Sequence, residues 1–348
     1  MWQVIGQTRA LSMLQHGLEA GTLAHAYLMV GPPHVGKMTL ALNLAQALNC
    51  DAAERPCGEC SSCRKIASAS HADVQIIGLT QNEDSAEAKL IGIDQIKQMQ
   101  HSVSLPPFEG KHKVFIIDGA ELMSTEAANC LLKTLEEPVG KVTFLLLTVN
   151  DSLLPATVIS RCQRLELPPL PAAKVESELV AGRGIEPQRA GLLARLSHGC
   201  PGWAITAAAD NSWLQQRDEE LDKLLDVITA DCEERFAYVA PLAARFSQNR
   251  GAVYGVLDLW LDYWRDLMLV KIGCRDIITN IDRLARLAEM AQGYRLAQIK
   301  AFIESLRAAA EQLRKNANPR LVLEVLMLDI PRKEEGRDLA TQLSVNYG

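Results

Sequence analysis

The sequence predicts an α/β domain built on a parallel sheet, followed by a region that is helical throughout. Three observations lead to this prediction. Short apolar runs alternate with helix-like segments in the first half, a glycine-rich loop joins the first run to a helix, and the second half has no strand-like run. Continuous runs of Val, Ile, Leu and Phe are typical of strands buried on both faces, as in a parallel sheet covered by helices.

Five apolar runs are the candidate strands, and helix-like segments such as KMTLALNLAQALN and TEAANCLLKTLEE lie between them. The candidate strands are HAYLMVG (25–31), VQIIGL (74–79), KVFIID (113–118), VTFLLLTV (142–149) and CQRLEL (162–167). The proline-rich stretch LPPLPAAK (167–174) suits a linker at the end of this domain. We therefore expect the α/β domain to occupy residues 1–168.

Two helical domains are expected after the linker, at 169–209 and at 210–332, with a flexible polar tail at 333–348. The second of these contains apolar residues at helical spacing, which predicts a buried helix face. They are Leu257, Trp260, Leu261, Trp264 and Leu267. Some of them could instead face partner subunits.

Composition restricts the classes of function. A chain of 348 residues fits two or three domains. The formal net charge of −6 argues against a free-standing DNA-binding protein, since such proteins use lysine and arginine to neutralise phosphates. No apolar run approaches the roughly 20 residues that a membrane span needs, and no secretory signal pattern is visible. The cytoplasm is the expected location.

The stretch GPPHVGKMT, from Gly31 to Thr39, nearly matches the phosphate-loop pattern G-x-x-x-x-G-K-[ST]. In such a loop, backbone N–H groups point at phosphate oxygens and the lysine reaches the β- and γ-phosphates. The hydroxyl that should follow the lysine and hold Mg²⁺ is missing, because Met38 stands there. The context predicts a genuine phosphate-loop fold, and it leaves open whether nucleotide is still held.

A second defect concerns the acidic residues of the same predicted site. Asp118 ends the third apolar run, where a metal-binding aspartate belongs. Many hydrolases of this architecture have a glutamate directly after that aspartate to orient the attacking water. Gly119 occupies this position here, and Glu121 is expected to lie too far along the turn to replace it. Together with Met38, this predicts little or no ATP turnover.

Four of the nine cysteines are clustered, at Cys50, Cys57, Cys60 and Cys63. Four thiolates at this spacing suit a structural, tetrahedral Zn²⁺ site, with His71 as a weak substitute ligand. An iron–sulfur site would place its fourth cysteine downstream before a proline, and a disulfide is less expected without an export signal. The other five cysteines are interpreted as reduced thiols: Cys130, Cys162, Cys200, Cys232 and Cys274.

The tripeptide Ser160-Arg161-Cys162 lies between a helical stretch and the last candidate strand. Its arginine could cap the helix or pair with a surface acid. In multimeric nucleotide hydrolases, however, an arginine offered across a subunit boundary stabilises the transition state of the neighbour. A subunit whose own site is damaged can still donate such an arginine finger.

These motifs together resemble the bacterial DNA polymerase III clamp-loader subunits of the AAA+ class. The resemblance rests on VIGQ, HAYLMVGPPHVGK, the four cysteines, VFIIDGAELMSTEAANCLLKTLEEP, FLLLT and SRC, and it covers about residues 1–205. The helical C-terminal region, with NANPRLVLEVL (316–326), is similar to the collar domain of this group. The resemblance implies an AAA+ phosphate-loop domain with a zinc-binding insert, a helical lid and an all-α collar.

Two types of subunit in this group must be distinguished. The motor (gamma/tau) type has a hydroxyl after the loop lysine, a glutamate after the strand aspartate and an arginine in the lid that senses the γ-phosphate. Here the matching lid stretch is GCPGWA (199–204), so that Gly202 stands where the arginine would be. With three departures from the motor pattern, the chain resembles the delta-prime type, which donates its arginine and does not hydrolyse ATP.

The resemblance also implies roles for individual residues. Arg161 would reach the ATP of a neighbouring motor subunit, the four cysteines would bind zinc, and Thr148 would be a polar sensor or simply a strand-end cap. The remnant nucleotide site, with ATP or ADP bound weakly or not at all, would consist of Val4, Ile5, Gly31, Gly36, Lys37, Thr39 and Asp118.

The implied partners are other clamp-loader subunits, motor and delta-type, in a hetero-pentamer, and through them the sliding clamp and primed DNA. The chain would thus support ATP-dependent clamp loading as a component of the DNA polymerase III holoenzyme, a DNA-directed DNA polymerase. Two alternatives remain open at this point. The chain could be an active motor subunit of the same complex, or a zinc-containing phosphate-loop protein with an unrelated interaction role.

Overall fold

The computed structural model describes residues 2–79, 90–137, 140–210 and 212–333. Contacts group the chain into two compact units, one of residues 1–184 with 197–205 and the other of 185–196 with the chain from 206 onward. The domain boundaries at 168, 209 and 332 remain predictions. The predicted flexible tail lies, apart from Lys333, outside the described residues.

The first unit contains the predicted parallel sheet of five strands, in the order β2-β3-β4-β1-β5, with every neighbouring pair parallel. The strands are β1 (Ala26–Val30), β2 (Val74–Ile77), β3 (Lys113–Asp118), β4 (Val142–Thr148) and β5 (Gln163–Glu166). They fall inside the five predicted runs, and β2 ends two residues early. After β2, the Gly78 carbonyl accepts a hydrogen bond from Gln95 Nε2 (3.0 Å) instead of continuing the sheet.

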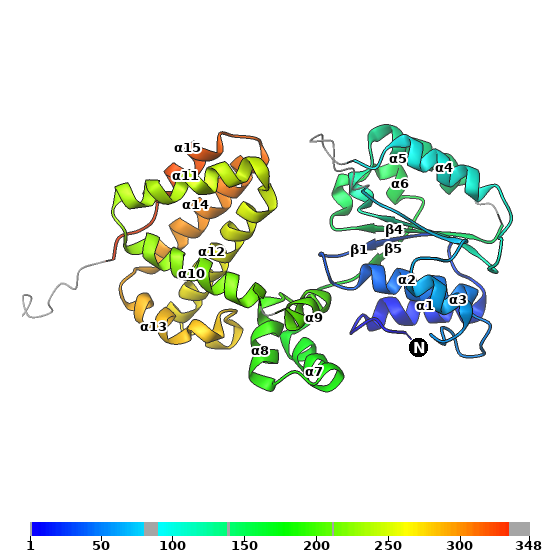
Figure 1. Cartoon of the computed structure of the whole chain (residues 1–348), viewed down its shortest axis with the longest axis horizontal. Coiled ribbons are helices and arrows are strands. Elements are labelled where there is room, and N and C mark those ends of the chain that lie inside the picture. The colour runs from blue at the N-terminus through cyan, green and yellow to red at the C-terminus, as the bar shows by residue number, and fades with distance from the viewer. Residues whose placement is uncertain (1, 80–89, 138–139, 211, 334–348) are drawn as a thin grey trace, which may run out of the picture. The chain divides into compact units, whose positions relative to one another are not determined.

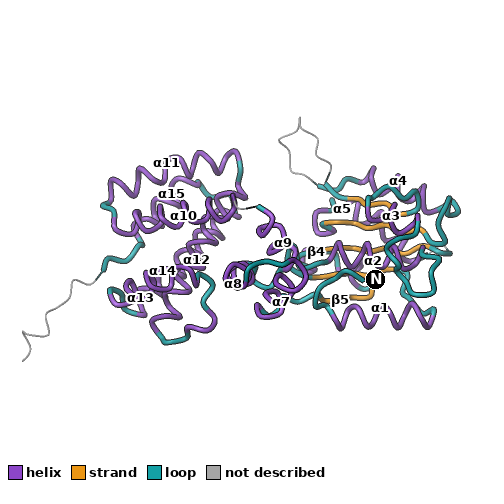
Figure 2. Tube along the Cα trace, turned by 60° about the horizontal axis from the view of Figure 1, so that its bottom comes forward, coloured by secondary structure: helices purple, strands orange, loops and turns teal. Residues whose placement is uncertain are grey.

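Helices cover both faces of this sheet, as the continuous apolar runs predict (Figures 1 and 2). One face packs against α1 and α2, and the other against α4, α5 and α6. Every residue of β1 and β4 is buried, which fixes these two strands at the centre of the unit. The helices are α1 (Thr8–Ala20), α2 (Lys37–Asn49), α3 (Ser61–Ala67), α4 (Ile93–Val103), α5 (Thr125–Glu136), α6 (Ala156–Ile159) and α7 (Ala172–Arg183).

The second unit is helical throughout its described residues, as predicted. Its helices are α8 (Pro187–Leu196), α10 (Ser212–Thr229), α11 (Cys232–Gln248), α12 (Arg250–Lys271), α13 (Leu284–Gln292), α14 (Leu296–Arg314) and α15 (Pro319–Leu328). The remaining helix, α9 (Pro201–Ala209), starts in the first unit and ends in the second. None of the described helices is long and apolar enough to span a membrane.

The core of the helical unit forms around α12. The predicted stripe on this helix is confirmed as core: Leu257, Trp260, Trp264 and Leu267 are buried and Leu261 is half-buried. The Trp264 ring lies 4.7 Å from the ring of Phe302 on α14, centroid to centroid. Burial of large aromatic side chains in this way supplies much of the free energy that holds helices together.

Candidate functional site

The phosphate loop follows the central strand β1 and leads directly into α2. The Gly31 N–H donates to the Thr148 carbonyl (3.1 Å), which ties the start of the loop to the end of β4. A Cβ at Gly31 would overlap the Leu167 carbonyl oxygen, and Gly36 has a φ of 109°. Both positions therefore require glycine, and the predicted strand–loop–helix arrangement is confirmed.

The lysine of the loop is turned inward. Lys37 Nζ donates to the carbonyl oxygens of Gly31 (2.6 Å) and Pro32 (2.8 Å), and the residue is only 9% exposed. Burial lowers the pKa of Lys37, while the nearby charges of Glu121 and Asp118 act in the opposite direction. The loop itself thus satisfies the ammonium group that would otherwise meet a phosphate.

The first turn of α9 packs against the phosphate loop. The Gly202 N–H donates to the His34 carbonyl oxygen (2.9 Å), and His34 has a positive φ of 60°. A Cβ at Gly202 would come within 2.8 Å of that same oxygen. The position that carries a sensing arginine in the motor type is therefore held with its backbone against the loop, without room for a side chain.

The acidic residues lie where β3 ends. Asp118 is exposed at the end of this strand. Glu121 lies in the following short helix (Ala120–Leu122), and its Oε1 accepts a hydrogen bond from the Val149 N–H (3.3 Å). Among the charges that act on the Lys37 pKa, Glu121 has the largest effect. Glu121 is therefore, like Asp118, one of the charged groups near Lys37.

Thr148 has local partners at the end of β4. Its Oγ1 donates to the Asn150 carbonyl (3.1 Å) and accepts from the Asn150 N–H (3.2 Å), and the residue is 1% exposed. This is the bonding expected of a strand-end cap, which was one of the two readings for this residue. The sensor role stays a prediction.

Val4 and Ile5, two residues of the predicted remnant nucleotide site, lie near the phosphate loop and near helices α7 and α9. Val4 is beside the loop, since its Cγ2 is 3.4 Å from where a Gly36 Cβ would be. Ile5 lines a cavity of about 50 Å³ together with Leu179, Pro201 and Ile205. Ligand pockets usually measure about 300–1,000 Å³, so this cavity is far too small for a purine base. Thr39 is half-buried in the first turn of α2.

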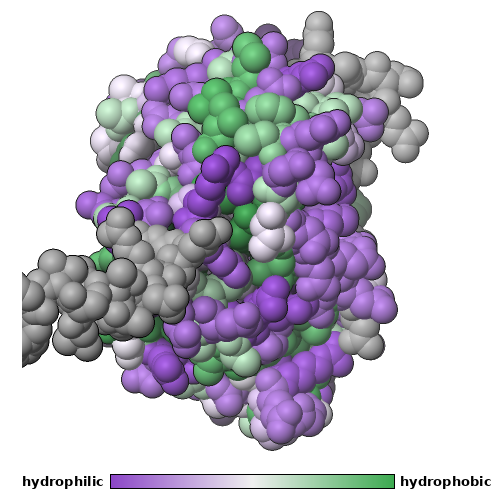
Figure 3. All heavy atoms as spheres, turned by 90° about the vertical axis from the view of Figure 1, so that its left-hand side faces the viewer, coloured by the Kyte–Doolittle hydropathy of each residue, from purple (hydrophilic) through white to green (hydrophobic). Residues whose placement is uncertain are grey.

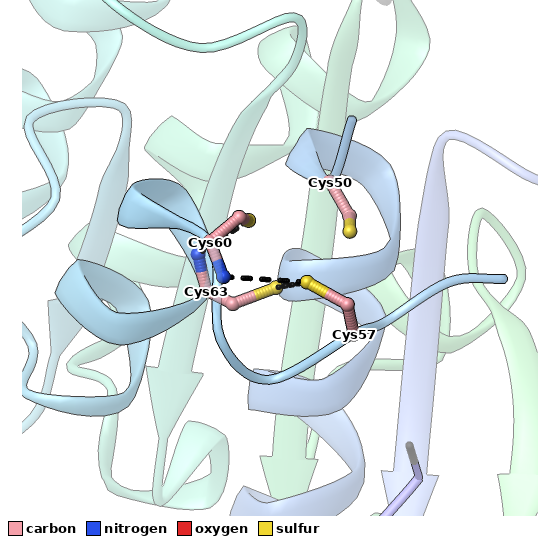
Figure 4. A group of neighbouring side chains, drawn as sticks. All are labelled: Cys50, Cys57, Cys60 and Cys63. Carbon is pink, nitrogen blue, oxygen red and sulfur yellow. Dashed lines mark hydrogen bonds between the residues drawn. The ribbon is translucent and has the colours of Figure 1, made fainter. Parts of the chain in front are cut away.

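The four clustered cysteines converge between the C-terminal end of α2 and the start of α3 (Figure 4). All four sulfur atoms lie within 4.8 Å of one another, and those of Cys57 and Cys63 are 3.9 Å apart. Four sulfurs bound at about 2.3 Å to a tetrahedral Zn²⁺ would lie roughly 3.8 Å apart, so the arrangement fits this ion. The grouping found among the described residues does not include His71.

Backbone groups already support the sulfur ligands. The Cys60 N–H donates to Cys57 Sγ (3.3 Å), and the Cys63 N–H donates to Cys60 Sγ (3.4 Å). Donation from Cys60 and Glu59 lowers the pKa of the Cys57 thiol to about 6, whereas burial raises the pKa of Cys63 to about 12. A bound cation would favour the thiolate form at all four positions.

The Ser160-Arg161-Cys162 corner lies between α6 and β5. Arg161 is partly exposed and forms an ion pair with Glu136, the last residue of α5, with Nη2 and Oε1 2.5 Å apart. Cys162 packs against the core beneath, and burial raises the pKa of its thiol to about 12. Glu136 has no assigned role in the sequence analysis, although the TLEEP stretch that contains it was part of the resemblance.

Comparison with known proteins shows which family has a similar sequence. A family model described as "DNA polymerase III, delta subunit" matches residues 6–171, and a second, for the C-terminal part of that subunit, matches 213–332. DNA polymerase III subunit delta' of Bacillus subtilis is 28% identical over 323 residues, which is 92% of this chain and 95% of that protein. The chain belongs to the delta-prime family of DNA polymerase III clamp-loader subunits.

This delta-prime family member is also similar to proteins that carry the names of other DNA polymerase III subunits. DNA polymerase III subunit tau of Bacillus subtilis is 36% identical over 182 residues, but this covers 52% of the chain and 30% of that protein. A solved structure of a gamma subunit-related protein from Thermotoga maritima is 17% identical, with a TM-score of 0.47. It covers 91% of this chain and 98% of its own.

Proposed function

We propose that this delta-prime-type subunit donates Arg161 to the ATP site of a neighbouring motor subunit and does not hydrolyse ATP itself. The observation that supports this best is the contrast between two cationic side chains. Arg161 stands partly exposed at a corner of the α/β unit, whereas Lys37 is buried among carbonyl oxygens of its own loop. Arg161 is therefore available to another subunit, whereas the Lys37 ammonium is bonded within its own loop.

Several features support the absence of turnover at the chain's own site. Met38 replaces the metal-binding hydroxyl, and Gly119 replaces the water-orienting glutamate. Gly202 leaves no room for a sensing arginine, and the cavity beside Ile5 is too small for adenine. The roles of Asp118, Thr39 and Thr148 in a remnant site stay part of this proposal, with ATP or ADP bound weakly or not at all.

We infer a structural role for zinc at the four cysteines. Four sulfur ligands fill a tetrahedral coordination shell, which leaves no open position for water or substrate. The ion would join the end of α2 to the start of α3. It would stabilise the fold and take no part in the chemistry.

The proposed partners are motor and delta-type subunits in a hetero-pentamer, which would act on the sliding clamp and primed DNA. The helical unit offers suitable surface, because Leu321, Val325 and Leu328 are each 57–60% exposed on one side of α15. Figure 3 shows hydrophobic residues gathered among polar ones on the upper part of this unit's outer face. Exposed apolar patches of this kind often mark subunit contacts.

The test is ATP hydrolysis by the reconstituted complex containing Arg161→Ala. An arginine finger contributes about 10³–10⁵ in rate at the site that it serves, so turnover at that site should be almost lost. Arg164→Ala is the matched control, because Arg164 is a nearby exposed arginine that pairs with Asp151 (2.7 Å). A complex that assembles normally and keeps the wild-type rate with Arg161→Ala contradicts the proposal.

The alternative of an active motor subunit has one observation in its favour, the carboxylate of Glu121 near Lys37. It predicts that the isolated chain hydrolyses ATP and that Lys37→Ala abolishes this. The donor role predicts no turnover by the isolated chain. It also predicts that Lys37→Ala leaves the rate of the complex unchanged.

A further inference from the structure

Arg161 is held in place by groups from two segments of the chain. Its Nη2 pairs with Glu136 Oε1 (2.5 Å) at the end of α5. Its Nη1 donates to the Thr157 carbonyl (3.0 Å) within α6 and to Oγ of Ser160 (3.3 Å), the residue that ends this helix. The guanidinium is therefore fixed from more than one direction before any partner arrives.

We propose that Glu136 is a positioning residue for Arg161, which orients the guanidinium toward the phosphate of the neighbouring subunit. This inference rests on the donor role proposed above. An arginine side chain has many rotamers, and the entropy of this freedom must be lost when it engages a phosphate. A carboxylate that orders the side chain in advance removes part of this loss from the catalytic step.

Stability alone does not account for the pair. The side chains of Arg161 and Glu136 are 34% and 49% exposed, and exposed ion pairs contribute little to the free energy of folding. Glu136 also stands in the last turn of α5, where the helix dipole disfavours negative charge. The acid is therefore placed where it does little for its own helix and much for the orientation of Arg161.

The bonds that hold Arg161 leave part of its guanidinium able to contact a phosphate. The bonds to Glu136, Thr157 and Ser160 use only part of the donor capacity of the guanidinium, and the side chain remains one-third exposed. One edge can stay on the carboxylate while the remaining N–H groups meet a phosphate oxygen. The planar guanidinium, with five N–H donors in a fixed fork, suits such simultaneous contacts better than the ammonium group of lysine does.

The experiment measures ATP hydrolysis by the reconstituted complex with Glu136→Ala, Glu136→Gln and the control Glu137→Ala. Glu137 is the adjacent exposed carboxylate, and among the described residues the carboxylate that bonds to Arg161 is that of Glu136. A small misplacement of a catalytic group can reduce a rate by up to about 100-fold, so Glu136→Ala should lower kcat at the served site by about 10- to 100-fold. KM for ATP, complex assembly and thermal stability should stay unchanged.

Two further variants separate positioning from a structural role. Glu136→Gln retains an oxygen acceptor and should recover part of the lost kcat. Glu136→Ala added to Arg161→Ala should have no further effect, because Glu136 acts only through Arg161.

Each contrary outcome has a distinct meaning. If Arg161→Ala lowers the rate but Glu136→Ala does not, the positioning role is wrong and the donor role stands. The positioning role is also wrong if Glu136→Ala raises the rate, which would make the ion pair a restraint, or if it lowers the rate further in the Arg161→Ala background. If Arg161→Ala itself has no effect, the donor role fails and the inference fails with it.

Discussion

The two ends of α2 differ in how the protein arranges the side chains that could bind a ligand. At the N-terminal end, the phosphate loop turns its lysine onto its own carbonyls and packs its backbone against Gly202. At the C-terminal end, Cys50 joins three further sulfurs at distances that suit a tetrahedral metal ion. At one end the lysine is bonded within its own loop, and at the other four sulfur atoms stand together at distances that suit an ion.

This difference indicates that a phosphate-loop fold does not require a bound nucleotide when contacts within the chain support the loop. Contacts within the protein support the loop, because the Lys37 ammonium donates to the Gly31 and Pro32 carbonyls and the His34 carbonyl accepts from the Gly202 N–H. For the four sulfur atoms we expect a cation to have this role, since thiolates this close to one another repel and a bound cation offsets that repulsion. This contrast predicts that removal of the metal lowers the stability of the protein at the C-terminal end of α2. It also predicts that addition of nucleotide has no effect at the N-terminal end.

Metal removal should have the largest effect. A structural zinc ion contributes about 10–16 kcal/mol where the whole fold depends on it, and we expect a loss of several kcal/mol here because the sheet has its own core. Thermal unfolding with and without a chelator, and of Cys60→Ser, measures this loss. Cys232→Ser is the control, since Cys232 is exposed at the start of α11. An unchanged Tm after verified metal removal would show that this end of α2 is also self-sufficient.

Gly202→Ala should have an intermediate effect. The added Cβ would meet the His34 carbonyl oxygen at 2.8 Å, so we expect a loss of about 1–3 kcal/mol through overpacking. The control Gly255→Ala adds a methyl group in open space on α12 and should stabilise the chain by up to about 1 kcal/mol. Urea unfolding of both variants gives the comparison. If both substitutions change the free energy of unfolding by equally small amounts, α9 is not held against the loop.

The sequence predicted the local parts of this arrangement better than the distant ones. The five strands, the loop and the cysteine cluster could be predicted because each is encoded by neighbouring residues through hydrophobic pattern or spacing. The Gly202–His34 bond and the Glu136–Arg161 pair join residues far apart in the chain, and no local signal specifies them. The electrostatic effect of Glu121 on Lys37 likewise depends on how the turn after β3 folds, and its inability to replace a water-orienting glutamate stays a prediction.

Addition of ATP to the isolated chain should have the smallest effect, which is none. A ligand present at 100 times its Kd stabilises a protein by about 2.7 kcal/mol, so binding of any strength relevant to turnover would be visible as a rise in Tm. We expect no rise, because Lys37 is bonded to Gly31 and Pro32 and the cavity beside Ile5 cannot admit a purine. The measurement is a thermal shift at an ATP concentration that saturates a motor subunit run in parallel. A shift that disappears in Lys37→Ala would show that the loop still binds nucleotide, and the contrast between the two ends of α2 would then be wrong.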